Sequence, residues 1–352
     1  MSANHSFVIL EIAKNLISLR FFATLLIRTR LYGLFTNLPK LAAFINHLSV
    51  LLSDKKTGVI YYNMKVHLDC IPCFLRQALQ AARFATNNEQ KHEDALRASL
   101  EAIAESNWHA TPSEIGIRVH FTVMDVLDIK DPYREKKIKS NAIVLDMYEY
   151  LQKEIGNNND PVDKAIRFAI AGNIMDYGAK SEFNIHDTLQ RLKHEKLKID
   201  HSMEFRHDIK NVDTIAYLTD NAGEIVFDRL LMETIDKTYG KKKWHVFVKA
   251  KPIINDATLD TAKQAGLGGN ENIIIDVIDF GRDYDDRTDP AFLEKLATYD
   301  VVISKGQGNY EALSDVSRIN FYFLLMAKCP VVARDIGVDT GDILLIRQSH
   351  KD

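Results

Sequence analysis

The spacing of apolar residues divides the chain after residue 63 into a helical half and an alternating half. Over residues 64–200, apolar side chains recur every three or four positions, as from Cys70 to Phe84 and from His92 to Ile103, which predicts amphipathic helices. From about residue 211, short apolar runs alternate with stretches of helical spacing. This order predicts a doubly wound, mainly parallel, Rossmann-like α/β sheet that follows a helical domain.

Several helix starts in the first half carry recognisable capping residues. Thr111-Pro112-Ser113-Glu114 has the spacing of a capping box with proline at the first helical position. Asp131-Pro132 and Asp160-Pro161 combine a capping aspartate with proline in the same way, and the second pair opens a strongly apolar helix over Val162 to Met175. Each pair therefore predicts a helix that begins at its proline.

The second half contains short apolar runs that predict strands, separated by segments that predict helices. The predicted strands lie at Thr214–Leu218, Trp244–Lys249, Ile273–Val277, Val301–Ser304, Pro330–Arg334 and Ile343–Ile346. The predicted helices lie at about Glu224–Lys237, Asp256–Ala265, Pro290–Ala297 and Ser317–Ala327.

Polar residues follow the first predicted strand where the next helix begins. Asp220 and Asn221 come directly after the buried run, and Ala222-Gly223-Glu224 leads into the helix. In an open α/β sheet, ligands bind at this edge of the strands. A carboxylate beside an amide oxygen, followed by a helix N-terminus, suits a hard cation together with a phosphate.

Two further strand ends add residues of the same kind. Asn255 and Asp256 follow the second strand, and Lys305-Gly306-Gln307-Gly308-Asn309 follows the strand at residues 301–304. In a parallel sheet these ends share one edge, so we expect two carboxylates, several amides, a glycine-rich turn and a lysine to meet there. Oxygen ligands favour Mg²⁺ or Mn²⁺ over zinc. Asp220-Asn221 and Asn255-Asp256 alone also fit ordinary helix caps. The two glycines that flank Gln307 are the stronger signal, because they imply close backbone approach. The combination at one edge indicates a site.

The composition is that of an ordinary globular protein, with 352 residues of which 46% are hydrophobic and 26% charged. A formal net charge of −3 predicts no nucleic-acid partner. The three cysteines form no disulfide framework, which favours a reducing, cytoplasmic location.

Residues 1–63 differ from the rest of the chain. They hold seven Lys or Arg and two acidic residues, a net charge of +5. Their longest uninterrupted apolar run, Phe21 to Ile27, is far shorter than the roughly 20 residues of a spanning helix. We interpret them as an atypical N-terminal extension, either upstream of a true start at Met64 or used for targeting or membrane contact.

The cysteines form a separate pattern. Cys70 and Cys73 lie three residues apart on one face of a predicted helix, and Cys329 follows Lys328. Three interpretations fit: buried inert thiols, a disulfide or redox pair, or a second metal site that a histidine such as His67 would complete.

Taken in order, these segments resemble one known family, the metal-dependent damage-control phosphatases, which are related to the acidic-residue methyltransferase-like proteins. The resemblance covers Met64 to about Ile346, and its Cys-x-x-Cys start is similar to the stand-alone prokaryotic branch. It rests on Cys70-Ile71-Pro72-Cys73, Asp131-Pro132-Tyr133, Gly172-Asn173-Ile174-Met175-Asp176, Asp220-Asn221-Ala222-Gly223-Glu224, Asn255-Asp256 and Lys305-Gly306-Gln307-Gly308-Asn309.

The resemblance implies a divalent metal held by Asp220, Asn221 and Asp256, with phosphate contacts from the turn that Lys305 begins. The eukaryotic branch carries an Arg-Thr-x-Lys segment, which here reads Leu325-Met326-Ala327-Lys328, so only its lysine is kept. The expected substrate-binding residues are Asn173, Asp176, Lys305, Gly306, Gly308, Asn309 and Lys328.

We therefore predict a metal-dependent phosphatase for small phosphorylated metabolites, either sugar phosphates or damaged cofactor-related phosphates. Asp220, Glu224 and Lys305 are the expected catalytic residues: Lys305 offsets charge, Glu224 orients or deprotonates a water, and Asp220 either holds the metal or attacks phosphorus. Mg²⁺ or Mn²⁺ is the expected cofactor, with Co²⁺ or Ni²⁺ as alternatives. A carboxyl methyltransferase using adenosylmethionine and a non-catalytic binder of metal or phospho-ligands are the competing functions.

The predicted organisation has three parts. They are the extension at 1–63, a helical domain at 64–205 and an α/β metal- and phosphate-binding domain at 206–352. No membrane partner is expected for residues 64–352, and the sequence leaves the oligomeric state open.

Overall fold

The computed structural model describes residues 64–172, 196–281 and 284–348. Contacts divide the chain into two units, Met1–Ile60 and Tyr61–Asp352, and the structure below is that of the second. The predicted extension at 1–63 lies outside the described residues and stays a prediction. Within the described ranges, no helix is long and apolar enough to cross a membrane, and the cytoplasmic location also stays a prediction.

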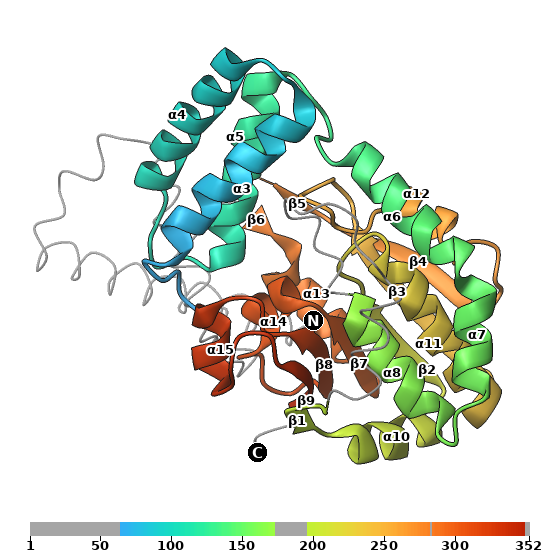
Figure 1. The fold of residues 1–352 in the computed structure, drawn as a ribbon. Coiled ribbons are helices and arrows are strands. Elements are labelled where there is room, and N and C mark those ends of the chain that lie inside the picture. Colours follow the sequence, from blue (N-terminus) through green and yellow to red (C-terminus); the bar gives the residue numbers. More distant parts are fainter. Residues whose placement is uncertain (1–63, 173–195, 282–283, 349–352) are drawn as a thin grey trace, which may run out of the picture. The chain divides into compact units, whose positions relative to one another are not determined.

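A seven-stranded sheet forms the centre of the α/β part (Figure 1). Its spatial order is β1-β9-β8-β7-β2-β3-β4, and every neighbouring pair is parallel except β8 and β9. The strands are β1 (Ile199–Asp200), β2 (Thr214–Leu218), β3 (Lys243–Lys249), β4 (Ile273–Ile278), β7 (Val301–Lys305), β8 (Phe321–Met326) and β9 (Ile343–Gln348). A separate hairpin pairs β5 (Phe280–Gly281) with β6 (Tyr284–Asp285). The predicted fold class is confirmed.

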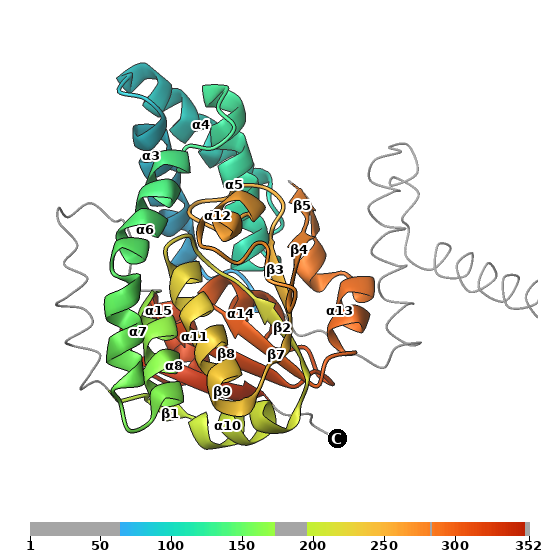
Figure 2. The same cartoon turned by 90° about the vertical axis from the view of Figure 1, so that its right-hand side faces the viewer.

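Helices cover both faces of this sheet, and Figure 2 shows α11 and α13 on opposite sides of it. On one face, alternate residues such as Ile215 and Tyr217 pack against α6 (Arg134–Asp146), α7 (Tyr148–Gly156), α8 (Pro161–Ala171), α10 (Ser202–Asn211), α11 (Glu224–Tyr239) and α12 (Leu259–Gln264). On the other face, Ala216 and Leu218 pack against α13 (Pro290–Leu296), α14 (Gln307–Leu313) and α15 (Pro330–Ile336). The period-two alternation of each strand thus supplies two cores.

The chain reverses its direction of travel across the sheet between β2 and β7. From β2 the chain continues to β3 and β4, whereas β7 leads to β8 and β9 on the other side. The helix after β2 lies on one face and the helix after β7 on the opposite face. The carboxyl ends of β2 and β7 therefore flank a topological switch point, where α/β proteins bind ligands.

Three helices at the start of the described chain have a core of their own. They are α3 (Cys70–Ala85), α4 (Glu89–Glu105) and α5 (Pro112–Leu127). Thr111 and Glu114 form the predicted capping box at the start of α5, and Asp160 caps α8 as predicted. Helices α6 to α8 instead share a core with the sheet, and β1 belongs to the sheet. The predicted domain boundary at residue 205 stays a prediction.

Three local predictions are wrong. Residues 317–327 were expected to form a helix, but Phe321–Met326 is the fully buried strand β8. Pro330–Arg334 was expected to form a strand, but it begins helix α15, with Cys329 as its N-cap residue. A run that is buried on both faces has no alternation that could distinguish strand from helix. The helix expected to begin at Pro132 begins two residues later, at Arg134, and the Asp131 side chain accepts the backbone amide of Tyr133 at 3.0 Å and pairs with Lys137.

His120 on α5 gives the stability of this part a pH dependence. Its ring is 2% exposed, and no described residue bonds its Nε2. Burial lowers the pKa of His120 from 6.5 to about 4. The unfolded chain binds the proton of His120 more readily than the folded chain does. The stability that the neutral ring preserves is therefore complete above pH 6.5 and is lost as the pH falls toward 4. We expect a loss of about 3 kcal/mol of unfolding free energy from this group over that window.

Denaturant unfolding of the wild type and of His120→Leu at several pH values measures this loss. The wild type should lose more stability than the variant between pH 7 and pH 4, since both share the carboxylates that titrate there. Parallel pH profiles for the two proteins would contradict the assignment.

Candidate active site at the β2–β7 switch point

The loop after β2 and the loop after β3 are joined backbone to backbone. Asn221 and Asp256 form an isolated antiparallel bridge, the amide of Ala257 donates to the Asp220 carbonyl at 2.7 Å, and Ala222 donates to the Asn255 carbonyl at 2.9 Å. These bonds place the side chains of Asp220, Asn221 and Asp256 at one sheet edge. The backbone therefore brings these three residues to the same edge, as the sequence analysis expected.

The turn after β7 crosses directly over Asp220. Gly306 has φ +80°, and a Cβ built on it would lie 1.9 Å from the Asp220 Oδ2 atom. Any other residue at position 306 would collide with that carboxylate and would also strain the backbone. The close approach of the Gly306 backbone to the Asp220 carboxylate thus requires a glycine at the end of this strand.

The carboxylates of this edge resist ionisation. Burial, followed by the negative charges of Glu224 and Asp256, raises the pKa of Asp220 to about 8, against the opposing charges of Lys328 and Lys249. Burial also raises the pKa of Asp256, against Lys249, Arg287 and Lys137. Two acids held together in this way need a nearby positive charge if both are to be ionised at neutral pH.

Lys249, the last residue of β3, brings a cation to this edge. Its side chain is buried, and its Nζ donates to the Asn309 Oδ1 atom at 3.1 Å. Burial, together with the charge of Arg287, lowers the pKa of Lys249 to about 8, although Asp256, Asp285 and Asp220 act in the opposite direction.

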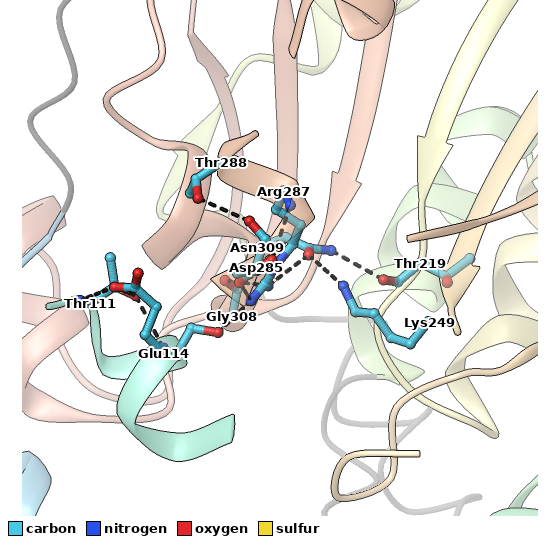
Figure 3. Close-up of polar contacts among 10 residues, drawn as sticks. Thr111, Glu114, Thr219, Lys249, Asp285, Arg287, Thr288, Gly308 and Asn309 are labelled. Atoms are coloured by element: carbon cyan, nitrogen blue, oxygen red, sulfur yellow. Dashed lines mark hydrogen bonds and ion pairs between the residues drawn. The ribbon is translucent and has the colours of Figure 1, made fainter. Parts of the chain in front are cut away.

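Asn309 connects the ends of three strands (Figure 3). Its Nδ2 donates to the carbonyls of Thr219 at 3.1 Å and Lys305 at 2.8 Å, while its Oδ1 accepts from Lys249 and from Arg287. Asn309 is 1% exposed, so its role in this arrangement is to hold the strand ends together. This geometry argues against the predicted direct contact of Asn309 with substrate.

Arg287 links the same turn to the helical part of the chain. It pairs with Asp285 and donates to the Gly308 carbonyl at 2.9 Å (Figure 3). It also donates to the hydroxyl of Ser113 in the first turn of α5. Gly308, predicted to contact phosphate, therefore offers its carbonyl to this arginine.

Lys305 points away from the edge and into the core beneath it. Its Nζ is fully buried and donates to Glu224 Oε1 at 2.6 Å, Asp228 Oδ1 at 2.6 Å and the Ala169 carbonyl at 2.8 Å. Burial would lower the pKa of Lys305, but the charges of Asp228 and Glu224 raise it to about 12. Asp228 also accepts from the Tyr217 hydroxyl at 2.8 Å.

This pairing changes the roles expected of two catalytic candidates. Glu224 is also fully buried, and its Oε2 accepts from Asn221 Nδ2 at 3.2 Å. Neither Glu224 nor Lys305 reaches solvent in this arrangement, which argues against direct contact with water or phosphate. Instead, Lys305 fixes the Glu224 carboxylate by donating a hydrogen bond to it. The amide nitrogen of Asn221 then donates both to Glu224 and to Asp220 Oδ2, the latter at 2.7 Å, so these two carboxylates fix the orientation of Asn221.

Helix α6 supplies two residues that the sequence analysis did not identify. Asn141 accepts from the Gly223 amide at 2.6 Å and donates to the Thr261 carbonyl at 2.9 Å, so it fixes the loop after β2. The charge of Lys137 lowers the pKa of Asp256. Both residues are buried on a charged helix with little amphipathic pattern, which is why their spacing gave no signal.

The other predicted residues have different outcomes. The charge of Lys328 lowers the pKa of Asp220, so this lysine belongs to the site, and its backbone amide bonds Gln307 at 3.0 Å. Asn173 and Asp176 lie outside the described residues, and their assignment stays a prediction. The three cysteines are free thiols.

The donor set fits a divalent cation with a preference for oxygen. Asn221 directs its amide nitrogen at two carboxylates, so its amide oxygen lies on the other side of the group. Together with the carboxylates of Asp220 and Asp256, this makes a set of oxygen donors, which Mg²⁺ and Mn²⁺ prefer. A bound cation would also offset the repulsion that raises the pKa of Asp220.

Comparison with known proteins agrees with this architecture. The sequence profile of the damage-control phosphatase ARMT1-like domain matches residues 66–344. A damage-control phosphatase of Pyrococcus horikoshii is 30% identical over 290 residues, covering 82% of this chain and all of that protein. A damage-control phosphatase of Archaeoglobus fulgidus is 33% identical over 295 residues, covering 80% of this chain and 98% of that protein.

A solved structure shares the fold as well. The crystal structure of a DUF89 family protein from Pyrococcus horikoshii superposes with a TM-score of 0.69 at 31% identity, covering 81% of this chain and 99% of that one. These relatives support a phosphatase role. The chain belongs to the damage-control phosphatase ARMT1-like family.

Proposed function

We propose that this protein is a metal-dependent phosphatase that hydrolyses small phosphorylated metabolites, such as sugar phosphates or damaged cofactor-related phosphates. The observation that carries the proposal is the Asn221–Asp256 backbone bridge, which brings the carboxylates of Asp220 and Asp256 together at the switch point of the sheet. Family membership gives the reaction class, since two relatives are named damage-control phosphatases.

Asp220, Asn221 and Asp256 would hold one divalent ion, either Mg²⁺ or Mn²⁺, with Co²⁺ or Ni²⁺ as alternatives. Such an ion, when bound, polarises the phosphoryl oxygens and stabilises the charge that develops on them. The support for this assignment is the oxygen chemistry of the three donors and the mutual repulsion of the two acids.

The chain itself contributes positive charge and rigid positioning. Lys328 and Lys249 carry positive charge close to Asp220, so they would attract the phosphate dianion and offset its charge in the transition state. Lys305 and Glu224 fix the orientation of Asn221 from beneath. Gly306 lets the turn after β7 lie against Asp220, so a phosphate bound there would be held between that turn and the loop after β3.

Phosphate release by the purified chain tests the proposal. The protein is first stripped with a chelator and then assayed against a panel of sugar phosphates and cofactor-derived phosphates, with Mg²⁺, Mn²⁺, Co²⁺ or Ni²⁺ added singly. We expect turnover with at least one ion, and we expect removal of that ion to lower the rate by about a hundredfold or more.

Three outcomes would overturn the proposal. The first is no phosphate release with any metal. The second is methyl transfer to a carboxylate substrate when adenosylmethionine is added, and the third is tight binding of phosphorylated ligands without turnover.

A further inference from the structure

All three cysteines of the chain meet at one place, although they come from opposite ends of the described sequence. Cys70 and Cys73 lie in the first turn of α3, and Cys329 is the N-cap residue of α15. Burial raises the pKa of Cys70, and the charges of Glu311, Cys329 and Cys73 each raise it further. The Cys70 thiol thus lies within electrostatic reach of Glu311 and of the other two thiols.

Two contacts link α15 to the start of α3. Arg334, in the last turn of α15, pairs with Asp69, the N-cap residue of α3, at 2.8 Å. Val331, two residues after Cys329, packs against the hydrophobic cluster that contains Cys70. These contacts place α15 beside the turn of α3 that carries Cys70.

Cys329 is also bonded to the turn that crosses Asp220. Gln307, between Gly306 and Gly308, donates from Nε2 to the Cys329 sulfur at 3.4 Å and to Glu311 at 2.8 Å. Its Oε1 accepts the backbone amide of Lys328 at 3.0 Å. Gln307 therefore connects Cys329 with the Gly306 turn and with Lys328, whose positive charge acts on Asp220.

The geometry favours one pairing among the three thiols. Residues three apart on a helix have Cβ atoms about 5–6 Å apart, whereas a disulfide needs about 3.5–4.5 Å. A regular first turn of α3 thus holds Cys70 and Cys73 farther apart than a disulfide needs, but Cys-x-x-Cys pairs at the start of a helix do form disulfides in redox proteins, so Cys70–Cys73 is the competing pairing. Cys329 lies on another element and is not held at a fixed helical spacing from Cys70. Among the described residues, no group of three or more His, Cys, Asp or Glu has metal-binding geometry.

We propose that Cys70 and Cys329 are a thiol–disulfide site, which a peroxide oxidises to a reversible disulfide that shifts the Gly306 turn and slows catalysis. The effect on catalysis rests on the proposed phosphatase function, whereas formation of the disulfide does not. Cys329 is the partly exposed thiol of the pair and Cys70 the buried one, so oxidation begins at Cys329.

The chemistry balances with one peroxide per disulfide. The Cys329 sulfur attacks the O–O bond, takes one oxygen as a sulfenic acid and releases the other as water. The Cys70 sulfur then attacks that sulfur, the S–O bond breaks, and a second water leaves. Two thiols thus lose two electrons to the peroxide. Glu311, whose pKa burial raises to about 7, lies near Cys70 and can accept its proton.

Counting thiols in the whole protein tests the disulfide directly, because the chain has only three cysteines. The reduced, folded protein should react with three equivalents of an alkylating agent after denaturation. After peroxide treatment it should react with one, and peptide mapping should find Cys70 linked to Cys329. A thiol reductant should restore all three. Cys73→Ser is the matched control and should still form the link.

Several outcomes would overturn the proposal. They are three thiols that persist after oxidation, a mapped link between Cys70 and Cys73, or zinc that copurifies with the reduced protein and is lost in Cys329→Ser. Mapping uses the unsubstituted protein, so the result does not depend on the folding of a variant.

Turnover measured on the same samples tests the coupling. Oxidation should lower phosphate release by about fivefold or more in the wild type and in Cys73→Ser, and reductant should reverse the loss. Cys329→Ser should keep its rate after peroxide. A disulfide that forms without changing turnover would overturn the coupling. If no metal supports turnover in the reduced protein, the proposed phosphatase function fails while the thiol count still decides the disulfide.

Discussion

Asp220→Asn should lower kcat/KM for phosphate release by about a thousandfold, which corresponds to about 4 kcal/mol of lost transition-state stabilisation. The substitution keeps the shape of the side chain but removes a negative donor from the proposed metal ligands. It also keeps an oxygen that can accept from Asn221, which bonds Asp220 Oδ2 in the wild type. The fold should therefore survive while the affinity for the divalent ion and the rate both fall.

The same substitution should stabilise the metal-free protein. The pKa of Asp220 is about 8 in the folded state and 3.8 in its ordinary environment. Since the folded protein holds this proton more tightly, ionisation of Asp220 costs stability progressively as the pH rises from 4 to 8. The variant has no such group, so at pH 8 and without metal it should melt at a higher temperature than the wild type.

Three measurements on two variants separate these effects. Asp260→Asn, an exposed carboxylate of α12 close in sequence to Asp256, is the matched control and should leave both activity and melting temperature unchanged. Mn²⁺ should raise the melting temperature of the wild type and of the control, but not that of Asp220→Asn. Activity within threefold of wild type in Asp220→Asn would contradict the role assigned to this residue.

The residues at the edge of the sheet were predictable because they depend only on strand order. Asp220, Asn221 and Asp256 each follow an apolar run, and parallel strands bring their carboxyl ends together whatever the side chains do. The same logic predicted that Gly306 lies at this edge. What makes its glycine necessary, the contact with Asp220, became visible only in the structure.

The direction of a side chain at a strand end was not predictable in the same way. Lys305 alternates with Ser304, and the two residues point to opposite faces of the sheet. The sequence offers no way to tell that Asp228, a turn further along α11 from Glu224, completes a buried pocket for the amine. Lys249 also ends a strand, but its amine lies near Asp220 and Asp256, the proposed metal ligands. Its position in the sequence gave no sign of this.

Some of the misassigned secondary structure carried a usable signal. The run Phe321-Tyr322-Phe323 is rich in aromatic residues, which favour strands. Cys329-Pro330 places proline at the first position of a helix, as Asp160-Pro161 does. Residues such as Asn141 and Lys137 had no comparable signal, because they act on loops more than 80 positions away in the sequence.

Lys305→Met should lower the free energy of unfolding by about 3–5 kcal/mol at pH 7, because it leaves the buried carboxylates of Glu224 and Asp228 without their cation. All three side chains are fully buried, and both carboxylates lie 2.6 Å from the lysine nitrogen. Even beside Lys305, burial raises the pKa of Asp228 to about 6. Without the lysine, Asp228 should take up a proton at neutral pH, so the deficit should shrink as the pH falls below 6.

Denaturant unfolding of the variant, of a double variant and of a control measures this cost. Lys243→Met, at the exposed start of β3, should change stability by less than about 0.5 kcal/mol. Lys305→Met combined with Asp228→Asn should recover more than half of the loss, since one uncompensated charge has been removed. If Lys305→Met alone stays within about 1 kcal/mol of the wild type, the lysine is not the counter-charge of these carboxylates. Its amine would then have to lie elsewhere, and the substrate contact expected from the sequence would again be the better assignment.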